Sequence, residues 1–412
     1  MTDHRVAVVG GSLAGLRAAE QLRAAGHAGP ITVFSAEPHP PYNRPPLSKE
    51  VLADPDLADA DAMVARLAFR RRASVEDVDF RLGADVRRAD LAAGELTWVG
   101  PDGQEGADPF DGLVAATGLL PRRLTAPGPA AGRLVLRTVG DCLALRAEIA
   151  DRPRRVVVVG AGFVGCETAC TLAARGHDVT VVEPTGAPMN RVLGAALAEA
   201  VQRHHEQHGL RFVIGPGVRG YAGIDRVTGV ELDDDSVLFA DLVIEAVGSV
   251  AATGWLQGNG LDLSDGVLTD NAMAVVGADR AVAVGDVARF PNPLFDDVPR
   301  RVEHWSMPTD TAKRAAPTLV ALLRGDRPDA APFAPIPSFW SDQGALRFQS
   351  FGSPALGDEV RLEEGDLDDL TSGVLTTHHR GGRHVGTVAV NLTPARQRGL
   401  RDAFVALTEA RS

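Results

Sequence analysis

The chain has 412 residues, which is more than one hydrophobic core usually serves, so two or three domains are expected. Apolar residues make up 45% of the chain, and charges or glycines interrupt every long apolar run, which argues against a membrane-spanning helix. The net charge of −12 argues against nucleic acid or an anionic membrane as the main partner.

Residues 6–34 are predicted to form a strand, a glycine turn, a helix and a second strand. Gly10, Gly11 and Gly15 follow the apolar run at 6–9, and Gly26 is the predicted C-cap of the helix. Such a turn binds phosphate, because its amides approach a pyrophosphate and the helix N-terminus supplies positive potential. No basic segment precedes the apolar run, so we expect no signal peptide and a cytoplasmic location.

The proline-rich segment 39–49 follows, and it is predicted to be an ordered loop because proline is excluded from helix interiors and central strands. It ends at Lys49, one of only two lysines in the chain; the other is Lys313. Arginine cannot replace lysine where a compact ammonium or a tunable pKa is needed, so Lys49 is a candidate for chemistry. A surface charge is the alternative. A buried strand is predicted at 112–118, and a linker at 121–132.

The strand, turn, helix and strand recur at residues 156–183. This second turn is complete, with Gly160, Gly162 and Gly165, whereas the first has Ser12 in the middle position. The second strand of the repeat ends at Glu183, which suits a ribose 2′-hydroxyl and repels a 2′-phosphate, so NADH is preferred to NADPH. Two dinucleotide sites indicate a flavin enzyme reduced by a nicotinamide, with a non-binding Rossmann domain as the alternative.

The rest of the chain contains a strand at 281–286, where Asp286 could bind a ribityl hydroxyl, and short alternating runs after Pro328. We therefore predict an α/β protein with two Rossmann-like dinucleotide-binding domains, the second inserted into the first, and a C-terminal α+β domain. The predicted boundaries are 1–121 and 249–326 for the FAD-binding domain, 122–248 for the NAD-binding domain and 327–412 for the C-terminal domain.

Several segments of the chain carry a family resemblance. The most selective are Pro41-Tyr42-Asn43-Arg44-Pro45-Pro46-Leu47-Ser48-Lys49 and Phe339-Trp340-Ser341-Asp342-Gln343. They are joined by both glycine turns, Ala116-Thr117-Gly118, Leu136-Arg137-Thr138, Val284-Gly285-Asp286 and Glu303-His304-Trp305. Along nearly its whole length the chain resembles the NADH-dependent ferredoxin reductases of oxygenase systems, which have a glutathione-reductase-like fold.

The resemblance implies FAD and NADH as cofactors. The ADP half of FAD is expected on Gly10, Ser12, Gly15 and Glu37, and its flavin, ribityl and phosphate parts on Arg44, Lys49, Thr117, Arg137 and Asp286. The other cofactor-binding residues expected are Ala14, Gly118, Gly160, Gly162, Phe163, Val164, Gly165, Glu167, Glu183, Gly248, Gly285, His304, Trp305 and Trp340.

The resemblance also implies the catalytic residues. Lys49 is expected beside flavin N5, paired with Glu167, because an ammonium there stabilises the anionic reduced flavin. Trp305 and Trp340 are expected to flank the isoalloxazine. For each of these tryptophans the alternative is a core or interface position.

The chain departs from the family pattern in two places. Asn43 stands where the family usually has Asp, and residues 306–311 replace an Asn-Ala-x-x-Gln-Gly run. That segment is expected to lead into a helix facing flavin N1 and O2, with Pro308 in its first turn. We expect these changes to affect the acceptor and the reduction potential rather than FAD binding.

The cysteines and histidines are not expected to form sites. The three cysteines of the chain are too few for a disulfide framework or an iron–sulfur cluster, and packing is favoured for Cys166 and Cys170. The proline-rich segment has no cysteine pair, so electrons are not expected to pass through a disulfide. His204, His205 and His208 could bind zinc, but a solvated helix face is favoured, and no metal site is predicted.

The predicted function is electron transfer from NADH through FAD to a 2Fe–2S ferredoxin that feeds an oxygenase of the P450 or Rieske type. Ferredoxins are usually acidic, so a basic docking patch is expected. Its predicted members are Arg300, Arg301, Lys313, Arg314 and Arg347. The alternatives are an NADH-dependent reductase or oxidase acting directly on a small acceptor, and a redox-sensing flavoprotein. Neither nucleic acid nor a membrane is an expected partner, and the sequence leaves the oligomeric state open.

Overall fold

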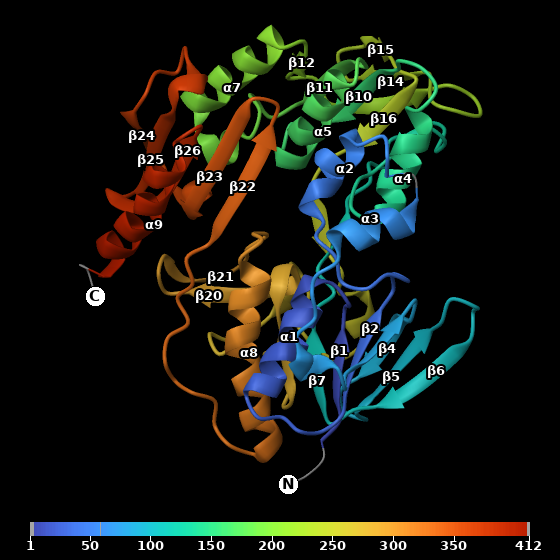
Figure 1. The fold of residues 1–412 in the computed structure, drawn as a ribbon, viewed down its shortest axis with the longest axis vertical. Helices are drawn as coiled ribbons and strands as arrows, with labels where there is room; N and C mark the ends of the chain where they lie inside the picture. Colours follow the sequence, from blue (N-terminus) through green and yellow to red (C-terminus); the bar gives the residue numbers. More distant parts are fainter. Residues whose placement is uncertain (1–3, 58, 410–412) are drawn as a thin grey trace. The chain divides into compact units, whose positions relative to one another are not determined.

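The computed structural model describes residues 4–57 and 59–409, which divide into two compact units (Figure 1). The first unit comprises the chain up to Asn43, Val64–Leu120 and Val250–Pro337. The second comprises Arg44–Met63, Pro121–Ser249 and the chain from Ser338 onward. Residues 44–63 thus cluster with residues 121–249, although they lie within the first predicted domain.

The centre of the first unit is a parallel sheet with the strand order β19–β7–β1–β2–β3. Its central strand is buried at every residue, which explains why its sequence is continuously apolar rather than alternating. Helices α1 and α8 pack against each other beside this sheet (Figure 1). The elements are β1 (Val6–Val9), β2 (Ile31–Ser35), β3 (Asp79–Leu82), β7 (Gly112–Ala115), β19 (Ala281–Ala283), α1 (Leu13–Ala24) and α8 (Met307–Arg324).

Two small sheets complete the first unit. One is the antiparallel meander of β4 (Asp85–Asp90), β5 (Glu95–Val99) and β6 (Glu105–Pro109). The other contains β18 (Val267–Leu268), β20 (Ala288–Asn292) and β21 (Asp296–Arg301). Short 3₁₀ helices are η2 (Ala73–Val75), η3 (Gly254–Leu256) and η4 (Gly285–Val287). Helix α3 (Ala60–Leu67) begins in the second unit and ends in the first.

The second unit repeats the parallel sheet, with the order β12–β11–β10–β16–β9. Val156 pairs with Val179 here as Val6 pairs with Ile31 in the first unit, so the sequence repeat is also a structural one. The strands are β9 (Arg133–Leu134), β10 (Arg155–Val159), β11 (Asp178–Glu183), β12 (Arg211–Ile214) and β16 (Leu242–Glu245). The helices are α4 (Val139–Glu148), α5 (Phe163–Ala174), α6 (Asn190–Leu193) and α7 (Ala195–Gln207). A three-stranded sheet contains β13 (Val218–Ala222), β14 (Gly229–Leu232) and β15 (Val237–Phe239).

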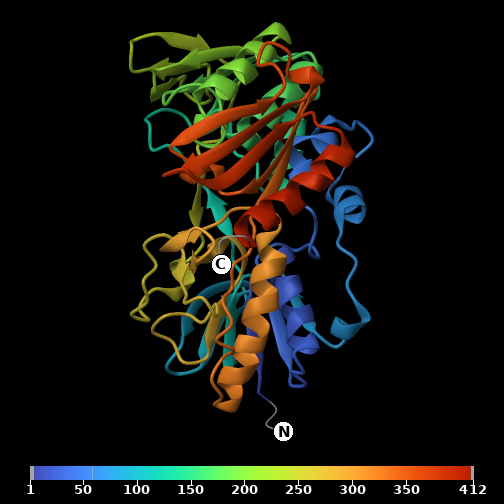
Figure 2. The ribbon, with the colours of Figure 1, turned by 90° about the vertical axis from the view of Figure 1, so that its left-hand side faces the viewer.

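The same unit contains an antiparallel sheet in the order β22–β23–β26–β25–β24, with α9 packed on β23 and β26 (Figure 2). Its elements are β22 (Ser338–Gln343), β23 (Leu346–Gly352), η5 (Pro354–Leu356), β24 (Glu359–Glu364), η6 (Leu370–Ser372), β25 (Val374–Arg380), β26 (Arg383–Val390) and α9 (Pro394–Glu409). Two parallel Rossmann-type sheets and a separate antiparallel sheet confirm the predicted α/β fold class. Strands β8 (Leu119–Pro121) and β17 (Ser249–Ala251) pair with each other.

The proline-rich segment differs from the expected loop. It contains the 3₁₀ helix η1 (Pro45–Ser48), followed by α2 (Glu50–Ala53). Both prolines occupy the first positions of η1, where no backbone N–H is needed, so they start this helix rather than break it. Within the described residues, no helix combines the length and apolar character required to cross a membrane.

Candidate active site

The glycine turn of the first unit is shaped by close backbone contacts. Gly10 has φ +116°, and a Cβ atom there would lie 2.2 Å from the Ala116 carbonyl oxygen. A Cβ atom at Gly15 would lie 1.9 Å from the carbonyl oxygen of Gly10. These two glycines are therefore required by the fold itself. Ser12, in the middle position, is the N-cap residue of α1 with an extended backbone, which a side chain tolerates.

The acid predicted for the ADP half of FAD lies after β2 in the same unit. The carboxylate of Glu37 accepts a hydrogen bond of 2.6 Å from the buried Tyr42 hydroxyl. Tyr42 was not among the predicted site residues, although it lies in the proline-rich segment. Because the phenol fixes one carboxylate oxygen, Glu37 is held in one orientation.

The glycine turn of the second unit leaves open space at its middle position. Gly160 and Gly165 again approach backbone atoms, since added Cβ atoms would lie 2.4 Å from the Ala246 oxygen and 2.1 Å from the Gly160 oxygen. A Cβ atom at Gly162 would meet nothing within 4 Å. Gly162 is the N-cap residue of α5, where the helix N-terminus favours an anion. The turn therefore fits a pyrophosphate.

The acid at the end of β11 is held against this turn. Glu183 accepts hydrogen bonds from the Ala161 amide at 2.9 Å and from the Thr185 amide and hydroxyl at 3.0 and 2.6 Å. Its carboxylate is thereby fixed beside the glycine turn. This arrangement suits ribose hydroxyls and opposes a 2′-phosphate.

Lys49 and Glu167 form a buried ion pair in the second unit. The Lys49 ammonium lies 2.8 Å from Glu167 Oε2, with the two side chains only 12% and 6% exposed. The Ser48 hydroxyl donates to Oε2 and the Ser341 hydroxyl donates to Oε1, each at 2.6 Å. Glu167 lies on α5, and its partners come from η1 and β22. The structure thus brings together the two residues that the resemblance implied as a pair.

A hydrogen bond from the helix reinforces this arrangement. The Thr171 hydroxyl, one turn after Glu167 on α5, donates to the Ser48 carbonyl at 2.8 Å. Lys49 also donates to the Pro45 carbonyl at 3.2 Å. The 3₁₀ helix η1 is therefore fastened to α5, and its position holds the ammonium beside the carboxylate.

The residues expected around the flavin lie in both units. In the second unit Arg44 donates to the Arg137 carbonyl at 3.0 Å, so two predicted residues contact each other. In the first unit the Thr117 hydroxyl donates to the Ala252 carbonyl at 2.6 Å, and the Ala252 amide donates to the Gly118 carbonyl at 3.0 Å.

The departing segment 306–311 begins α8, as expected, with Pro308 in the first turn. The Gly285 amide, next to Asp286, donates to the buried Thr311 hydroxyl at 2.9 Å. Thr311 was not predicted as a site residue. Its hydroxyl fastens α8 to the turn that presents Asp286.

The two tryptophans are partly exposed rather than packed in a core. Trp305 in the first unit and Trp340 in the second are each 41% exposed. The indole of Trp305 donates to Asn43 Oδ1 at 3.3 Å, which gives a partner to the residue that replaces the family's Asp. Burial lowers the pKa of the neighbouring His304 to about 4, so that imidazole is neutral at pH 7.

The remaining predicted residues lie near the two glycine turns. Phe163 contacts the Phe339 ring, with ring centroids 4.7 Å apart, while Val164 is 48% exposed. Gly248 follows β16 with φ +88° and open space around its Cα. Ala14 lies in the first turn of α1.

Comparison with known proteins decides the family. A model described as pyridine nucleotide-disulphide oxidoreductase matches residues 4–312. The chain belongs to this family. The predicted resemblance is confirmed, and the protein is an oxidoreductase.

Several relatives of this oxidoreductase are named as ferredoxin reductases. It is 32% identical over 400 residues to a probable ferredoxin reductase of Castellaniella defragrans, covering 94% of this chain and 91% of that one. It is 33% identical over 395 residues to the ferredoxin–NAD(+) reductase component of the anthranilate 1,2-dioxygenase system of Burkholderia cepacia, covering 93% and 90%. The structure of a covalent putidaredoxin reductase–putidaredoxin complex matches with a TM-score of 0.85 and 27% identity, over 99% of this chain and 94% of that chain.

Unlike the disulphides of the family name, the cysteines of this oxidoreductase are free thiols. Burial raises the pKa of Cys142 to about 11 and that of Cys170 to about 12, so both stay protonated at neutral pH. Cys166 is fully buried, as its predicted packing role requires.

The predicted solvated face of α7 is wrong for His205, which is only 2% exposed, because its ring lies against Gln343 of β22 and Cys170 of α5. His204 and His208 stack, with ring centroids 4.2 Å apart. Within residues 4–57 and 59–409, no three His, Cys, Asp or Glu side chains are grouped to hold a metal ion.

The residues predicted to dock a ferredoxin carry less free charge than the sequence suggests. In the fold, each of these residues has a carboxylate oxygen within 4 Å of a side-chain nitrogen. The pairs are Arg300–Asp296, Arg301–Asp265 and Arg301–Glu303, Lys313–Asp310, Arg314–Asp329 and Arg347–Asp342. The first four cations lie in the first unit and Arg347 lies in the second.

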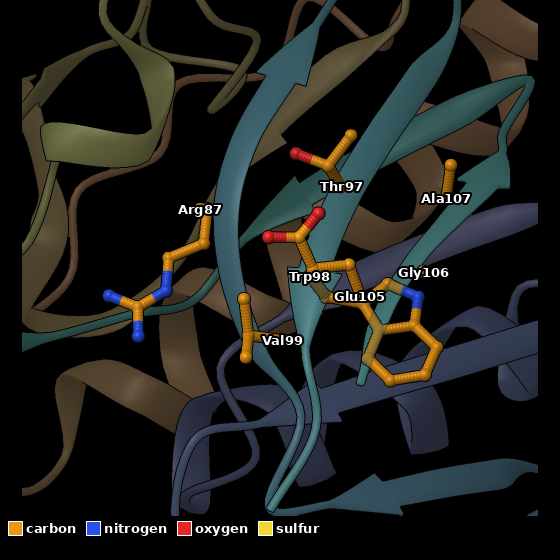
Figure 3. A pocket seen from close by; sticks show the side chains of 7 residues that line it. All are labelled: Arg87, Thr97, Trp98, Val99, Glu105, Gly106 and Ala107. Carbon is orange, nitrogen blue, oxygen red and sulfur yellow. The ribbon is translucent and has the colours of Figure 1, made fainter. Parts of the chain in front are cut away.

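Two cavities lie outside the predicted cofactor residues. One, of about 410 Å³, lies on the meander β4–β6 beside Arg87 and Trp98, and Figure 3 shows its lining. The other, of about 240 Å³, lies in the second unit between α5, α7 and the β22–β23 turn. Gln343 lines the second cavity, and its hydrogen bond to Ser341 links it to Glu167.

Proposed function

We propose that this oxidoreductase transfers electrons from NADH through FAD to a 2Fe–2S ferredoxin that feeds an oxygenase. When bound, FAD supplies the conversion of a two-electron hydride donor into one-electron steps. The observation that carries the proposal is the buried Lys49–Glu167 pair, which lies in the same unit as the open Gly162 turn. The ferredoxin and the oxygenase in this proposal are suggested by the names of the relatives.

The two turns hold different parts of the cofactors in this proposal. The turn from Gly10 to Gly15, with Glu37 oriented by Tyr42, binds the ADP half of FAD. The turn at Gly162 binds the NADH pyrophosphate, and Glu183 binds the adenosine ribose. The fixed carboxylate of Glu183 supports NADH over NADPH.

Lys49 is the proposed catalytic cation. A nearly dry ammonium stabilises developing negative charge more strongly than a hydrated one, because the surrounding dielectric is low. Glu167 keeps the ammonium in place through a short ion pair and is itself held by two serine hydroxyls. Trp305 of the first unit and Trp340 of the second are each proposed to contact the flavin, which their partial exposure supports.

The proposed ferredoxin surface includes Arg300, Arg301, Lys313, Arg314 and Arg347. Their carboxylate partners moderate the local charge, so docking would rely on orientation as much as on net attraction. We also propose a cytoplasmic location. Three free thiols suit the cytosol, where thiols are kept reduced.

Anaerobic stopped-flow absorbance of the flavin tests the function. NADH should bleach the flavin, NADPH should do so far more slowly, and a 2Fe–2S ferredoxin should restore the flavin absorbance as it is reduced. Glu167→Gln should slow the bleaching by about 100-fold, as loss of one preorganised electrostatic group typically does. Bleaching that no ferredoxin reverses, with rapid turnover on a quinone or oxygen, would replace the ferredoxin by a small acceptor.

A further inference from the structure

The hydrogen bonds around Glu167 continue away from Lys49 in an ordered chain. Gln343 lies two residues after Ser341 on the same face of β22, and its amide nitrogen donates to the Ser341 hydroxyl at 3.1 Å. Its amide oxygen lies 2.9 Å from His205 Nε2 on α7. His205 Nδ1 lies 3.6 Å from Cys170 Sγ on α5. All of these residues belong to the second unit, and Ser341, Gln343 and His205 are at most 2% exposed.

The surroundings fix the direction of every hydrogen bond in this chain. The Gln343 nitrogen also donates to the Met189 sulfur at 3.2 Å. A flipped amide would turn its oxygen toward that sulfur and toward a hydroxyl that already donates to Glu167, so neither neighbour would supply a proton. The amide oxygen therefore faces His205, and since an amide oxygen only accepts, His205 Nε2 carries the proton.

The protonation states of the outer groups agree with this direction. Burial lowers the pKa of His205 to about 4, so its ring is neutral at pH 7 and Nδ1 is an acceptor. Burial raises the pKa of Cys170 to about 12, so its thiol keeps the proton that it donates to Nδ1. Every donor consequently points toward Glu167, from Cys170 through His205, Gln343 and Ser341.

Other charged and titratable groups face the two ends of the chain. His204, on the same helix, and His208, at its C-cap, lower the pKa of His205 further. The residues facing Glu167 are Lys49 and Ser48 from the η1 segment, Ser341 from β22 and Cys166 and Cys170 from α5. Lys49 is the only cation in this set, so among the residues that the structure describes no other cation pairs with this carboxylate.

We propose that Gln343 and His205 are positioning residues that orient the Ser341 hydroxyl toward Glu167 and thereby hold Glu167 against Lys49. A serine hydroxyl has one proton and rotates freely. The N–H of Gln343 occupies its acceptor side, so its proton is directed to the carboxylate, and the aligned bonds polarise one another. This proposal rests on the proposed catalytic role of the Lys49–Glu167 pair.

The test compares four variants with the wild-type holoenzyme. Gln343→Met and His205→Leu break the chain, His205→Gln restores a donor at the position of Nε2, and His204→Gln is the matched control on the same helix outside the chain. The rate constant of flavin reduction at saturating NADH is followed from pH 5 to 9. Without the Gln343 N–H, the Ser341 hydroxyl can turn away from Glu167. A carboxylate that loses this donor accepts a proton more readily, so Gln343→Met should move the acid limb of this profile up by about one pH unit. His205→Leu should move it in the same direction, His205→Gln should restore it, and His204→Gln should leave it unchanged.

Nitrogen-15 NMR of the histidine rings provides a reading that is independent of activity. His205 should show the neutral Nε2–H tautomer from pH 5 to 8, and Gln343→Met should release it from this single tautomer. An Nδ1–H tautomer in the wild type would overturn the proposal. So would unshifted acid limbs in the Gln343 and His205 variants when Glu167→Gln slows flavin reduction; in that case the proposed function would stand alone. If Glu167→Gln leaves flavin reduction unchanged, the role of the pair falls, and positioning it has no purpose. His205 and Gln343 lie on different elements, so His205→Leu still tests the proposal if the Gln343→Met variant does not fold.

Discussion

Replacing Glu183 by Gln should change the choice between NADH and NADPH. A hydrogen bond to a charged acceptor is worth about 1.5–3 kcal/mol and one to a neutral acceptor about 0.5–1.5 kcal/mol. Loss of the charge therefore weakens each bond to a ribose hydroxyl by about 1 kcal/mol, so two hydroxyls give about a 30-fold higher Kd for NADH.

The same change removes the repulsion of a 2′-phosphate. Two unit charges about 8 Å apart repel by about 2 kcal/mol at an effective dielectric constant of about 20. Glu183 is partly exposed, so we discount this value and expect NADPH to bind about tenfold more tightly. The ratio of the two dissociation constants should then change by about 300-fold.

Stopped-flow flavin reduction at a series of NADH and NADPH concentrations measures both dissociation constants. The matched control is Asp178→Asn, at the other end of β11, where an exposed carboxylate pairs with Arg211 at 2.6 Å. In Glu183→Gln the new amide oxygen would remain an acceptor for the Ala161 amide, and water can replace the lost acceptor of the exposed Thr185 amide, so the turn should persist and the melting temperature should change little. A ratio that changes by less than about threefold would show that Glu183 does not read the ribose.

Three further predictions concern the turns, the buried imidazoles and the docking surface. Gly162→Ala should leave the melting temperature nearly unchanged and raise the Kd for NADH about tenfold or more. Gly165→Ala should lower the free energy of unfolding by about 1–3 kcal/mol, because its Cβ atom would lie 2.1 Å from a carbonyl oxygen. Equal melting temperatures of the two variants would contradict this division of roles. Burial lowers the pKa of His378 to about 4, so between pH 6.5 and 4 the unfolded chain binds a proton that the folded chain does not. The free energy of unfolding therefore falls by up to about 1.4 kcal/mol per pH unit from this group. His378→Gln should reduce this fall, as measured by urea unfolding at a series of pH values, and an unchanged dependence of the free energy of unfolding on pH would refute the argument. Lys313→Glu and Arg347→Glu should together raise the ferredoxin KM about tenfold and flatten its salt dependence, while ferricyanide reduction by NADH stays intact; a parallel fall of both activities would exclude a docking role.

The repeated strand–turn–helix units could be predicted from the sequence because their signals are local. The apolar runs, the glycines and the acids at 37 and 183 all lie within about thirty residues of one another in each unit. The Lys49–Glu167 pair joins residues far apart in the chain, and only the family resemblance indicated it. The structure adds what holds the pair, since the serine hydroxyls have no sequence pattern of their own.

The chain from Glu167 to His205 could not be predicted from a single sequence. His205 and Gln343 are 138 positions apart, on elements whose packing leaves no local signal. The spacing of His204 and His208 suggested a solvated helix face, and this pattern gave no sign that His205, which lies between them, is buried. The carboxylate partners of the docking residues could not be predicted either. Arg301, at the end of β21, pairs with Asp265 only in the folded chain.

The two lysines offer an opportunity for labelling. The side chain of Lys49 is 12% exposed and its amine lies 2.8 Å from a carboxylate oxygen, whereas the side chain of Lys313 is 60% exposed and its amine lies 3.8 Å from the Asp310 carboxylate. Amine-reactive dyes attack the free, accessible amine, so among the lysine side chains they should label one position almost exclusively. A fluorophore on Lys313 would then sit within the proposed ferredoxin surface, and its quenching by an added iron–sulfur protein would report association in real time, without any engineered cysteine.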